Sequence, residues 1–174
     1  MFLMKKFCMA ALAAISLGQC YTANAMDASL SVGHTGQSAM VYRLSLQSNW
    51  DKNWAESSVG HITGYWDTGF THWQADKGEN NNTLSFAPVF RYEFNGDYIK
   101  PFIDIGIGVS VFQHLEVEDQ KFGTAFNFED RIGAGLHFGN GQEVALRVIH
   151  YSNGGIREPN EGVEAYSLNY RIPL

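Results

Sequence analysis

Apolar and polar residues alternate along most of this chain, and the alternation recurs in eight segments. In an extended chain alternate side chains share a face, so each segment predicts a strand with one apolar side. The predicted strands cover about residues 28–33, 42–47, 54–66, 84–94, 99–111, 126–138, 144–152 and 164–174. In the third segment neither face is consistently apolar, which predicts a bulge. Pro88 predicts a local irregularity in the fourth.

The segments between these strands are rich in turn-forming residues. Short polar turns are expected near residues 50, 96 and 140, and longer connections near 36, 75, 118 and 157. Asp67 to Asn82 is predicted to be a long hydrated loop, and Gln113 to Thr124 another long polar connection. Alternating short and long connections between amphipathic strands are typical of outer-membrane barrels. The predicted fold is therefore all-β, an eight-stranded antiparallel transmembrane β-barrel of the outer-membrane type.

The polar faces of the strands carry charges of both signs, which favours an interior of paired charges. An eight-stranded barrel is too narrow for an open channel, so these side chains would fill it. Those expected to point inward are Arg43, Arg91, Glu93, Lys100, Asp104, Glu129, Arg131, Glu143, Arg147 and Arg171. The alternative is a soluble lipocalin-like lipid carrier, in which the apolar faces would instead surround a ligand. The many charges opposite Phe, Tyr and Ile favour the membrane barrel.

The first 25 residues have the three parts of a cleaved secretory signal: Lys5 and Lys6, an apolar run, and Ala23-Asn24-Ala25. The domains expected are therefore a signal peptide at 1–25 and a barrel at 26–174. Both cysteines of the 174-residue chain lie in the signal, so the mature chain would have neither disulfides nor thiolate chemistry. Cleavage would lower Lys+Arg from 12 to 10 against 18 Asp+Glu, a charge of −8, so no nucleic-acid partner is expected.

The candidate chemistry lies in the last predicted hairpin. His150 and Ser152 share the apolar face of one strand, and Glu164 begins the apolar face of the next. A histidine can activate a serine nucleophile, while a carboxylate orients the imidazole. Ionisable residues that face lipid usually mark function. The loop between the strands offers oxyanion donors, of which the candidates are Asn153, Gly154, Gly155 and Asn160.

A simpler interpretation of the same residues remains open at this point. His-x-Ser at a strand end is a weak motif, and Glu164 would serve equally well as a rim charge of a noncatalytic structural or adhesive barrel. The other histidines show no metal-ligand spacing. The acidic run of Glu116, Glu118 and Asp119 is compatible with a divalent cation but is more typical of a solvated loop. Neither a metal nor a cofactor is expected.

The run His150-Tyr151-Ser152-Asn153-Gly154-Gly155, followed by Pro159-Asn160-Glu161-Gly162-Val163-Glu164 and Tyr166-Ser167-Leu168, resembles the lipid A 3-O-deacylase (PagL) family. The resemblance implies an outer-membrane barrel that hydrolyses the ester at the 3 position of lipid A in lipopolysaccharide, with its site facing the outer leaflet. It implies a Ser-His-Glu triad at Ser152, His150 and Glu164. The expected partners are lipopolysaccharide and outer-membrane lipids, with a homodimer possible but the oligomeric state open.

Overall fold

The structure is a computed structural model that describes residues 26–174, so the predicted signal peptide and both cysteines lie outside the described residues. Eight long strands form the body of the fold, and two short strands form a separate hairpin. The long strands are β1 (Met26–Thr35), β2 (Met40–Asn49), β3 (Gly60–Gln74), β4 (Asn81–Phe94), β5 (Ile99–Phe112), β8 (Phe126–Phe138), β9 (Glu143–Ser152) and β10 (Val163–Pro173). Within residues 26–174 no helix is long and apolar enough to cross a membrane.

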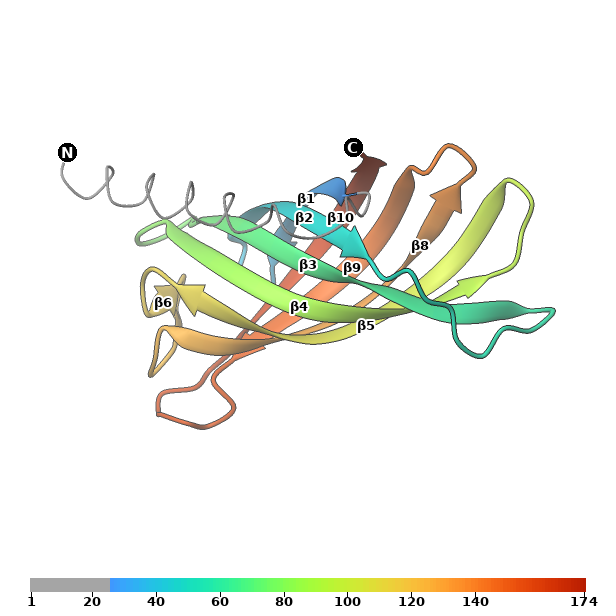
Figure 1. The fold of residues 1–174 in the computed structure, drawn as a ribbon. Helices are drawn as coiled ribbons and strands as arrows, with labels where there is room; N and C mark the ends of the chain where they lie inside the picture. Colours follow the sequence, from blue (N-terminus) through green and yellow to red (C-terminus); the bar gives the residue numbers. More distant parts are fainter. Residues whose placement is uncertain (1–25) are drawn as a thin grey trace.

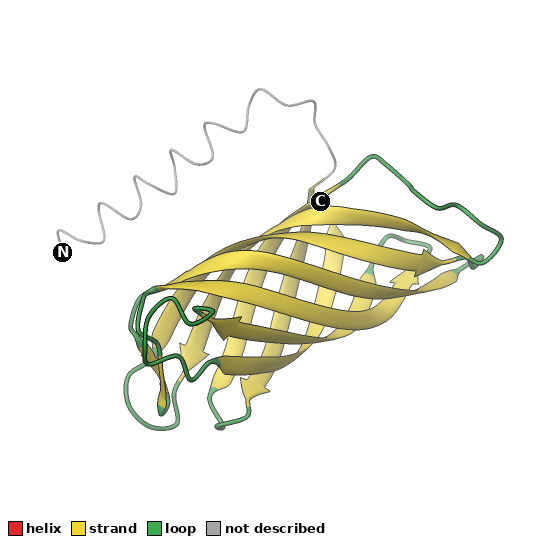
Figure 2. Ribbon diagram, turned by 90° about the horizontal axis from the view of Figure 1, so that it is seen from below, coloured by secondary structure: helices red, strands yellow, loops and turns green. Residues whose placement is uncertain are grey.

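The long strands close into one barrel in the order β1-β10-β9-β8-β5-β4-β3-β2, and every neighbouring pair is antiparallel. This confirms the predicted fold class. Figures 1 and 2 show an elongated barrel of tilted strands. We call the end that carries the β9–β10 loop and the small hairpin the loop end. The start of β1 and the C-terminus lie at the opposite end, the terminal end (Figure 1).

Connection lengths depart from the prediction at two places. The connection between β2 and β3 at the terminal end spans residues 50–59, whereas the β1–β2 connection at the loop end spans only 36–39. The predicted alternation of short and long connections is therefore wrong near residues 36 and 50. Part of the long connection is ordered against β3, because Trp54 and Ile62 form an isolated antiparallel bridge.

The predicted loop from Asp67 to Asn82 is also wrong, because most of it belongs to strands. Residues 67–74 continue β3, Asn81 and Asn82 begin β4, and only 75–80 connect them. Asp67 and Thr71 resemble loop residues because they are polar, but they point into the polar barrel interior and are buried. The register of β3 with both neighbours is continuous, so the predicted bulge is absent between Gly60 and Gln74.

Pro88 interrupts pairing as predicted, but without a change of register. The β4–β5 ladder omits residues 87 and 88 and resumes at Val89 opposite Gly106 in the same alignment. Because proline has no N–H to donate to the hydrogen-bond ladder between strands, a local gap in pairing is expected. The alternation of inward and outward side chains is unbroken through β4, with Ala87 and Val89 buried.

The outer surface of the barrel is apolar over its whole circumference. Leu30, Leu44, Phe70 and Ile105 are among its exposed side chains, each on a different strand and each between 46% and 58% exposed. An apolar band of this kind is stable only against lipid. The lipocalin-like alternative is therefore wrong, because the apolar side chains face outward.

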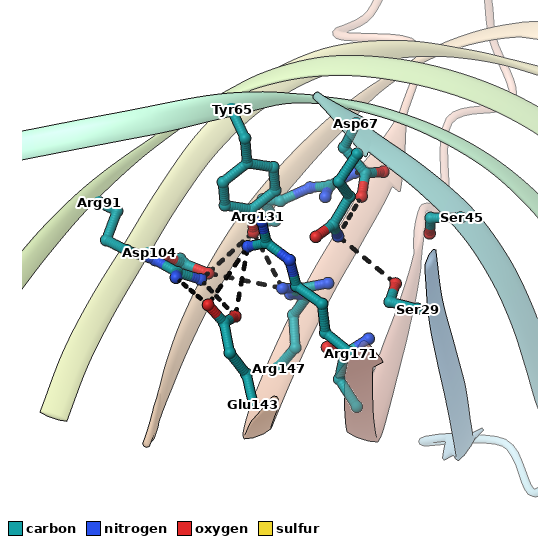
Figure 3. Close-up of polar contacts among 12 residues, drawn as sticks. Ser29, Ser45, Tyr65, Asp67, Arg91, Asp104, Arg131, Glu143, Arg147 and Arg171 are labelled. Carbon is teal, nitrogen blue, oxygen red and sulfur yellow. Dashed lines mark hydrogen bonds and ion pairs between the residues drawn. The ribbon is translucent and has the colours of Figure 1, made fainter. Parts of the chain in front are cut away.

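The inside of the barrel holds a network of paired charges (Figure 3). Asp67 pairs with Arg43 at 2.5 Å and with Arg131 at 3.1 Å, and Asp104 pairs with Arg91 at 2.8 Å. Nine of the ten predicted inward charges are buried; Lys100 is partly exposed and pairs with Glu93 at 3.1 Å. Because buried charges are costly unless paired, this network explains how a polar interior can be stable.

At the loop end an apolar plug replaces the charges. Its residues come from five of the long strands, from the β1–β2 connection and from the segment between β5 and β8: Ala39, Val41, Trp73, Phe112, Val117, Phe122, Ile149, Tyr151, Val163 and Ala165. The segment predicted as a polar connection, Gln113 to Thr124, contains the hairpin β6 (Glu116–Val117) and β7 (Gln120–Lys121). It folds inward because Val117 and Phe122 bury their side chains in the plug.

Candidate active site

His150 and Glu164 are direct cross-strand partners on β9 and β10. His150 Nδ1 lies 2.8 Å from Glu164 Oε1, so the imidazole N–H donates a hydrogen bond to the carboxylate. Both side chains lie on the outward face of the barrel, 39% and 40% exposed. In the neutral imidazole this hydrogen bond puts the proton on Nδ1 and leaves Nε2, the other ring nitrogen, able to act as a base.

Ser152 is the last residue of β9 and lies on the same outward face as His150. Residues two apart on a strand have Cα atoms ~7 Å apart, so their side chains can meet by leaning toward each other. Within residues 26–174 the Ser152 hydroxyl has no hydrogen-bond partner, and His150 is bonded only to Glu164. The structure therefore joins two of the three predicted residues by a hydrogen bond and places the third beside them.

Tyr151 anchors the strand segment between His150 and Ser152. Its side chain points inward and is 1% exposed. The ring packs edge-on against Trp73 and Phe112, with both centroid distances 5.4 Å, and Arg43 Nη1 donates to its hydroxyl at 3.3 Å. A rigid interior contact thus holds the backbone on which the two outward polar groups are displayed.

The loop after Ser152 is organised by Asn153, which is fully buried. Its backbone N–H donates to Asn160 Oδ1 at 2.8 Å, and its Nδ2 donates to the Arg157 carbonyl at 2.6 Å. Its Oδ1 accepts the Gly155 N–H at 2.9 Å. These bonds engage both the Asn153 and Gly155 amides within the loop. Among the described residues, the Gly154 N–H and Asn160 Nδ2 have no partner.

Glycine is required at the end of this loop for a specific reason. Gly162 has φ of +71°, and a Cβ built on it would lie 2.8 Å from Cε1 of His150. The residue therefore packs against the edge of the imidazole, where any side chain would force the ring or the loop to shift. Sequence reasoning treated Gly162 only as part of a family-like run, and the pattern itself contains no signal for this contact.

Asp130 is a polar residue of the site that sequence reasoning missed. It lies on β8 directly across from His150, on the side opposite Glu164. It is exposed on the outward face and has no hydrogen-bond or ion-pair partner among residues 26–174. The sequence does contain a signal for this residue. Asp130 is an acidic residue on an apolar face, which it shares with Phe128 and Ile132.

An open apolar groove on the outer surface leads to His150. We call it the His150 groove; its outward-facing lining is Pro88, Phe90, Ile105, Ile107, Asp130, Ile132, Val148 and His150. It crosses β4, β5, β8 and β9, and its volume of about 540 Å³ is within the range of small-molecule sites. The imidazole is thus next to a surface that suits a hydrocarbon chain.

The β6–β7 segment supports the site loop. Glu161 Oε2 accepts the Lys121 N–H at 2.6 Å, and the Glu161 N–H donates to the Lys121 carbonyl at 3.2 Å. Phe122 forms an isolated antiparallel bridge with Asn160. The loop that carries Asn160 and Gly162 is therefore pinned to a neighbouring loop.

Among the acidic loop residues, Glu118 binds backbone groups of a neighbouring loop. Glu118 accepts hydrogen bonds from the backbone N–H groups of Asp76, at 2.5 Å, and Lys77, at 3.1 Å. Among residues 26–174 no group of three or more His, Cys, Asp or Glu side chains is placed to hold a metal ion.

An apolar exterior, a charged interior and polar groups gathered at one rim define an outer-membrane β-barrel with a candidate hydrolase site. A model of the family described as lipid A 3-O-deacylase (PagL) matches residues 40–173. The lipid A deacylase PagL of Pseudomonas aeruginosa is 56% identical over 167 residues, which are 95% of this chain and 96% of that protein. The chain belongs to the lipid A 3-O-deacylase (PagL) family.

A further relative and a solved structure point to the same family. The lipid A deacylase PagL of Bordetella bronchiseptica is 35% identical over 107 residues, 60% of this chain and 58% of that protein. A crystal structure of the outer membrane enzyme PagL superposes with a TM-score of 0.82 at 57% identity, covering 85% of this chain and 99% of that one. The predicted family, fold and outer-membrane location are confirmed.

Proposed function

We propose that this chain is a lipid A 3-O-deacylase, a cofactor-free serine esterase that hydrolyses the ester-linked 3-hydroxyacyl chain at the 3 position of lipid A. The single observation that supports this most is the 2.8 Å hydrogen bond between His150 and Glu164 on the outward face. A catalytic pair on the lipid side of a barrel can only meet a substrate that is itself in the membrane. Family membership identifies lipid A as that substrate.

In the proposed reaction His150 Nε2 takes the proton of the Ser152 hydroxyl as its oxygen attacks the ester carbonyl carbon. The tetrahedral intermediate collapses as the protonated imidazole gives its proton to the departing 3-oxygen of the sugar. Water, deprotonated by His150, then attacks the acyl-enzyme carbonyl. The bond to Ser152 Oγ breaks, the imidazolium returns its proton to Ser152 Oγ, and the hydroxyacyl chain leaves as a free acid. Glu164 holds the imidazole in the required tautomer and stabilises its positive charge.

The tetrahedral oxyanion needs hydrogen-bond donors close to Ser152. The Gly154 N–H and Asn160 Nδ2 are the donors of the loop that have no partner among the described residues. Asn153 Nδ2 has a second hydrogen besides the one it gives to Arg157, and the Gly155 N–H would have to leave Asn153 Oδ1. We therefore place the oxyanion near Gly154 and Asn160, with Asn153 holding the loop in shape.

The proposed placement of the termini sets the orientation of the protein. Residues 1–25 are proposed to be a removed signal peptide, and both termini of the barrel are proposed to lie at the periplasmic surface. The loop end then faces outward, and His150, Ser152 and Glu164 lie at the outer leaflet, where lipopolysaccharide resides. The scissile chain would enter the His150 groove, and Asp130 would offer an acceptor to polar groups of the substrate.

Mass spectrometry of lipid A after incubation with purified, detergent-folded protein tests this function. The wild-type protein should remove one 3-hydroxyacyl chain from the 3 position, and Ser152→Ala should leave lipid A intact. Unchanged lipid A with a correctly folded wild-type barrel would favour the noncatalytic structural role instead. Full activity in folded Ser152→Ala would rule out the triad.

A further inference from the structure

A second apolar groove adjoins the His150 groove and has no part in the reaction described above. We call it the Ala134 groove; its outward-facing lining includes Val32, His34, Ala134, Leu146, Tyr166 and Leu168. Its volume is about 690 Å³, again within the range of small-molecule sites. The hollow exists because Ala134 is small, whereas its cross-strand partners Ile103 and Leu146 are large.

The two grooves share a wall. Ile132 and Val148 line both and are direct cross-strand partners, so a single pair of side chains separates the two hollows. Val148 and Tyr166 also face each other across β9 and β10, one outward position below the His150–Glu164 pair. The Ala134 groove therefore begins immediately beneath the groups proposed to do the chemistry.

The upper end of the Ala134 groove is bordered by aromatic rings. His34 and Tyr166 are cross-strand partners with ring centroids 5.9 Å apart. His34 Nδ1 donates to the Thr35 carbonyl at 2.9 Å, which fixes the ring. This edge is a firm wall against which a hydrocarbon chain could be held as it leaves the polar surface.

We propose that the Ala134 groove binds the acyl chain that stays on lipid A, the amide-linked chain on the sugar carbon next to the scissile ester. This rests on the proposed function, since it takes the reacting ester to lie at Ser152. Two acyl chains attached to neighbouring sugar carbons must extend into the membrane side by side. The His150 groove and the Ala134 groove also lie side by side, below the reacting groups. The enzyme thereby recognises a pair of chains, and Ala134 determines specificity for the pair.

Two synthetic probes separate this inference from the reaction itself. Both are glucosamine derivatives with the same 3-hydroxyacyl ester at the 3 position; one has a long amide-linked chain at the 2 position and the other an acetamido group. Their kcat/KM values are measured in mixed detergent micelles. The wild type should prefer the two-chain probe by about tenfold, the scale of discrimination by apolar pockets.

Ala134→Leu fills the groove and should lower kcat/KM for the two-chain probe about tenfold more than for the one-chain probe. The double variant Ala134→Leu/Leu146→Ala restores space at a direct cross-strand partner and should recover the preference. Ala28→Leu, on the outward face of β1 near the terminal end, is the matched control and should alter neither probe. A heat-dependent gel shift shows that each variant is folded.

Equal kcat/KM for the two probes in the wild type, or an unchanged ratio in folded Ala134→Leu, would overturn the inference and leave the groove as an ordinary contact with membrane lipid. A wild-type protein that hydrolyses neither probe nor lipid A would instead overturn the proposed function on which it rests.

Discussion

His150 and Glu164 face each other across β9 and β10, and a 2.8 Å hydrogen bond joins them on the outer surface of the barrel. The register of one strand pair creates this contact, because each side chain stands perpendicular to the sheet at the same level. A shift of the register by one residue would turn one of them into the interior. The site therefore depends on how the last hairpin closes the barrel.

The three proposed catalytic residues should differ in how much activity their removal costs. Ser152→Ala and His150→Ala are each expected to lower kcat at least ~10³-fold, because each removes the nucleophile or its base. Glu164→Ala should retain roughly 10 to 100 times more activity than Ser152→Ala, because it only orients the imidazole. Lipid A turnover by purified, folded variants measures this. If Ser152→Ala and an exposed control such as Glu158→Ala lost the same activity, Ser152 would not be the nucleophile.

Gly162→Ala should damage activity through His150. A Cβ at this position would lie 2.8 Å from the imidazole and sit on a backbone with φ of +71°. We expect at least a roughly tenfold lower kcat, since the ring loses its alignment with Glu164.

Gly155→Ala is the matched control for this substitution. Its φ is +77°, so the backbone strain is similar, but a Cβ there would have no neighbour within 4 Å. If both variants lost the same activity, backbone strain would explain the effect and contact with His150 would not.

Glu161→Ala should loosen the site loop. The carboxylate accepts the Lys121 N–H at 2.6 Å and so ties this loop to the β6–β7 segment. Losing one such hydrogen bond costs about 1 kcal/mol, which predicts a few-fold lower activity and faster amide exchange in residues 153–162. Glu158→Ala, in the same loop but with no side-chain partner among the described residues, should leave exchange as it is. Unchanged amide exchange in both variants would mean that the hydrogen bond between Glu161 and Lys121 does not stabilise the loop.

Asp67→Asn should destabilise the barrel through its interior. Asp67 is fully buried and pairs with Arg43 and Arg131. Removing its charge leaves two buried arginines less compensated, at a cost of about 3–5 kcal/mol in the free energy of unfolding. Urea unfolding in detergent measures the loss. An outward substitution on the same strand, Thr68→Ala, should change stability little, and equal stability of the two variants would show that the charge network is not a main source of stability.

Alternation along the sequence was enough to predict the class of fold, the number of long strands and which faces meet lipid. It works because a strand has a period of two, so one apolar face and one polar face are visible in the residue order. It failed at Asp67 and Thr71, where polar interior residues look like a hydrated loop. It also failed at Val117 and Phe122, because apolar residues scattered in a loop have no period.

The chain order alone placed His150, Ser152 and Glu164 on apolar faces, and their spacing resembled one family. Only the tertiary structure decided that Glu164 lies opposite His150, that Asp130 is the register partner of His150 on the other side and that Gly162 packs against the imidazole. These three relationships join β8, the end of the site loop and β10 to β9. They arise from barrel closure and strand register, which bring together residues that no local sequence pattern relates.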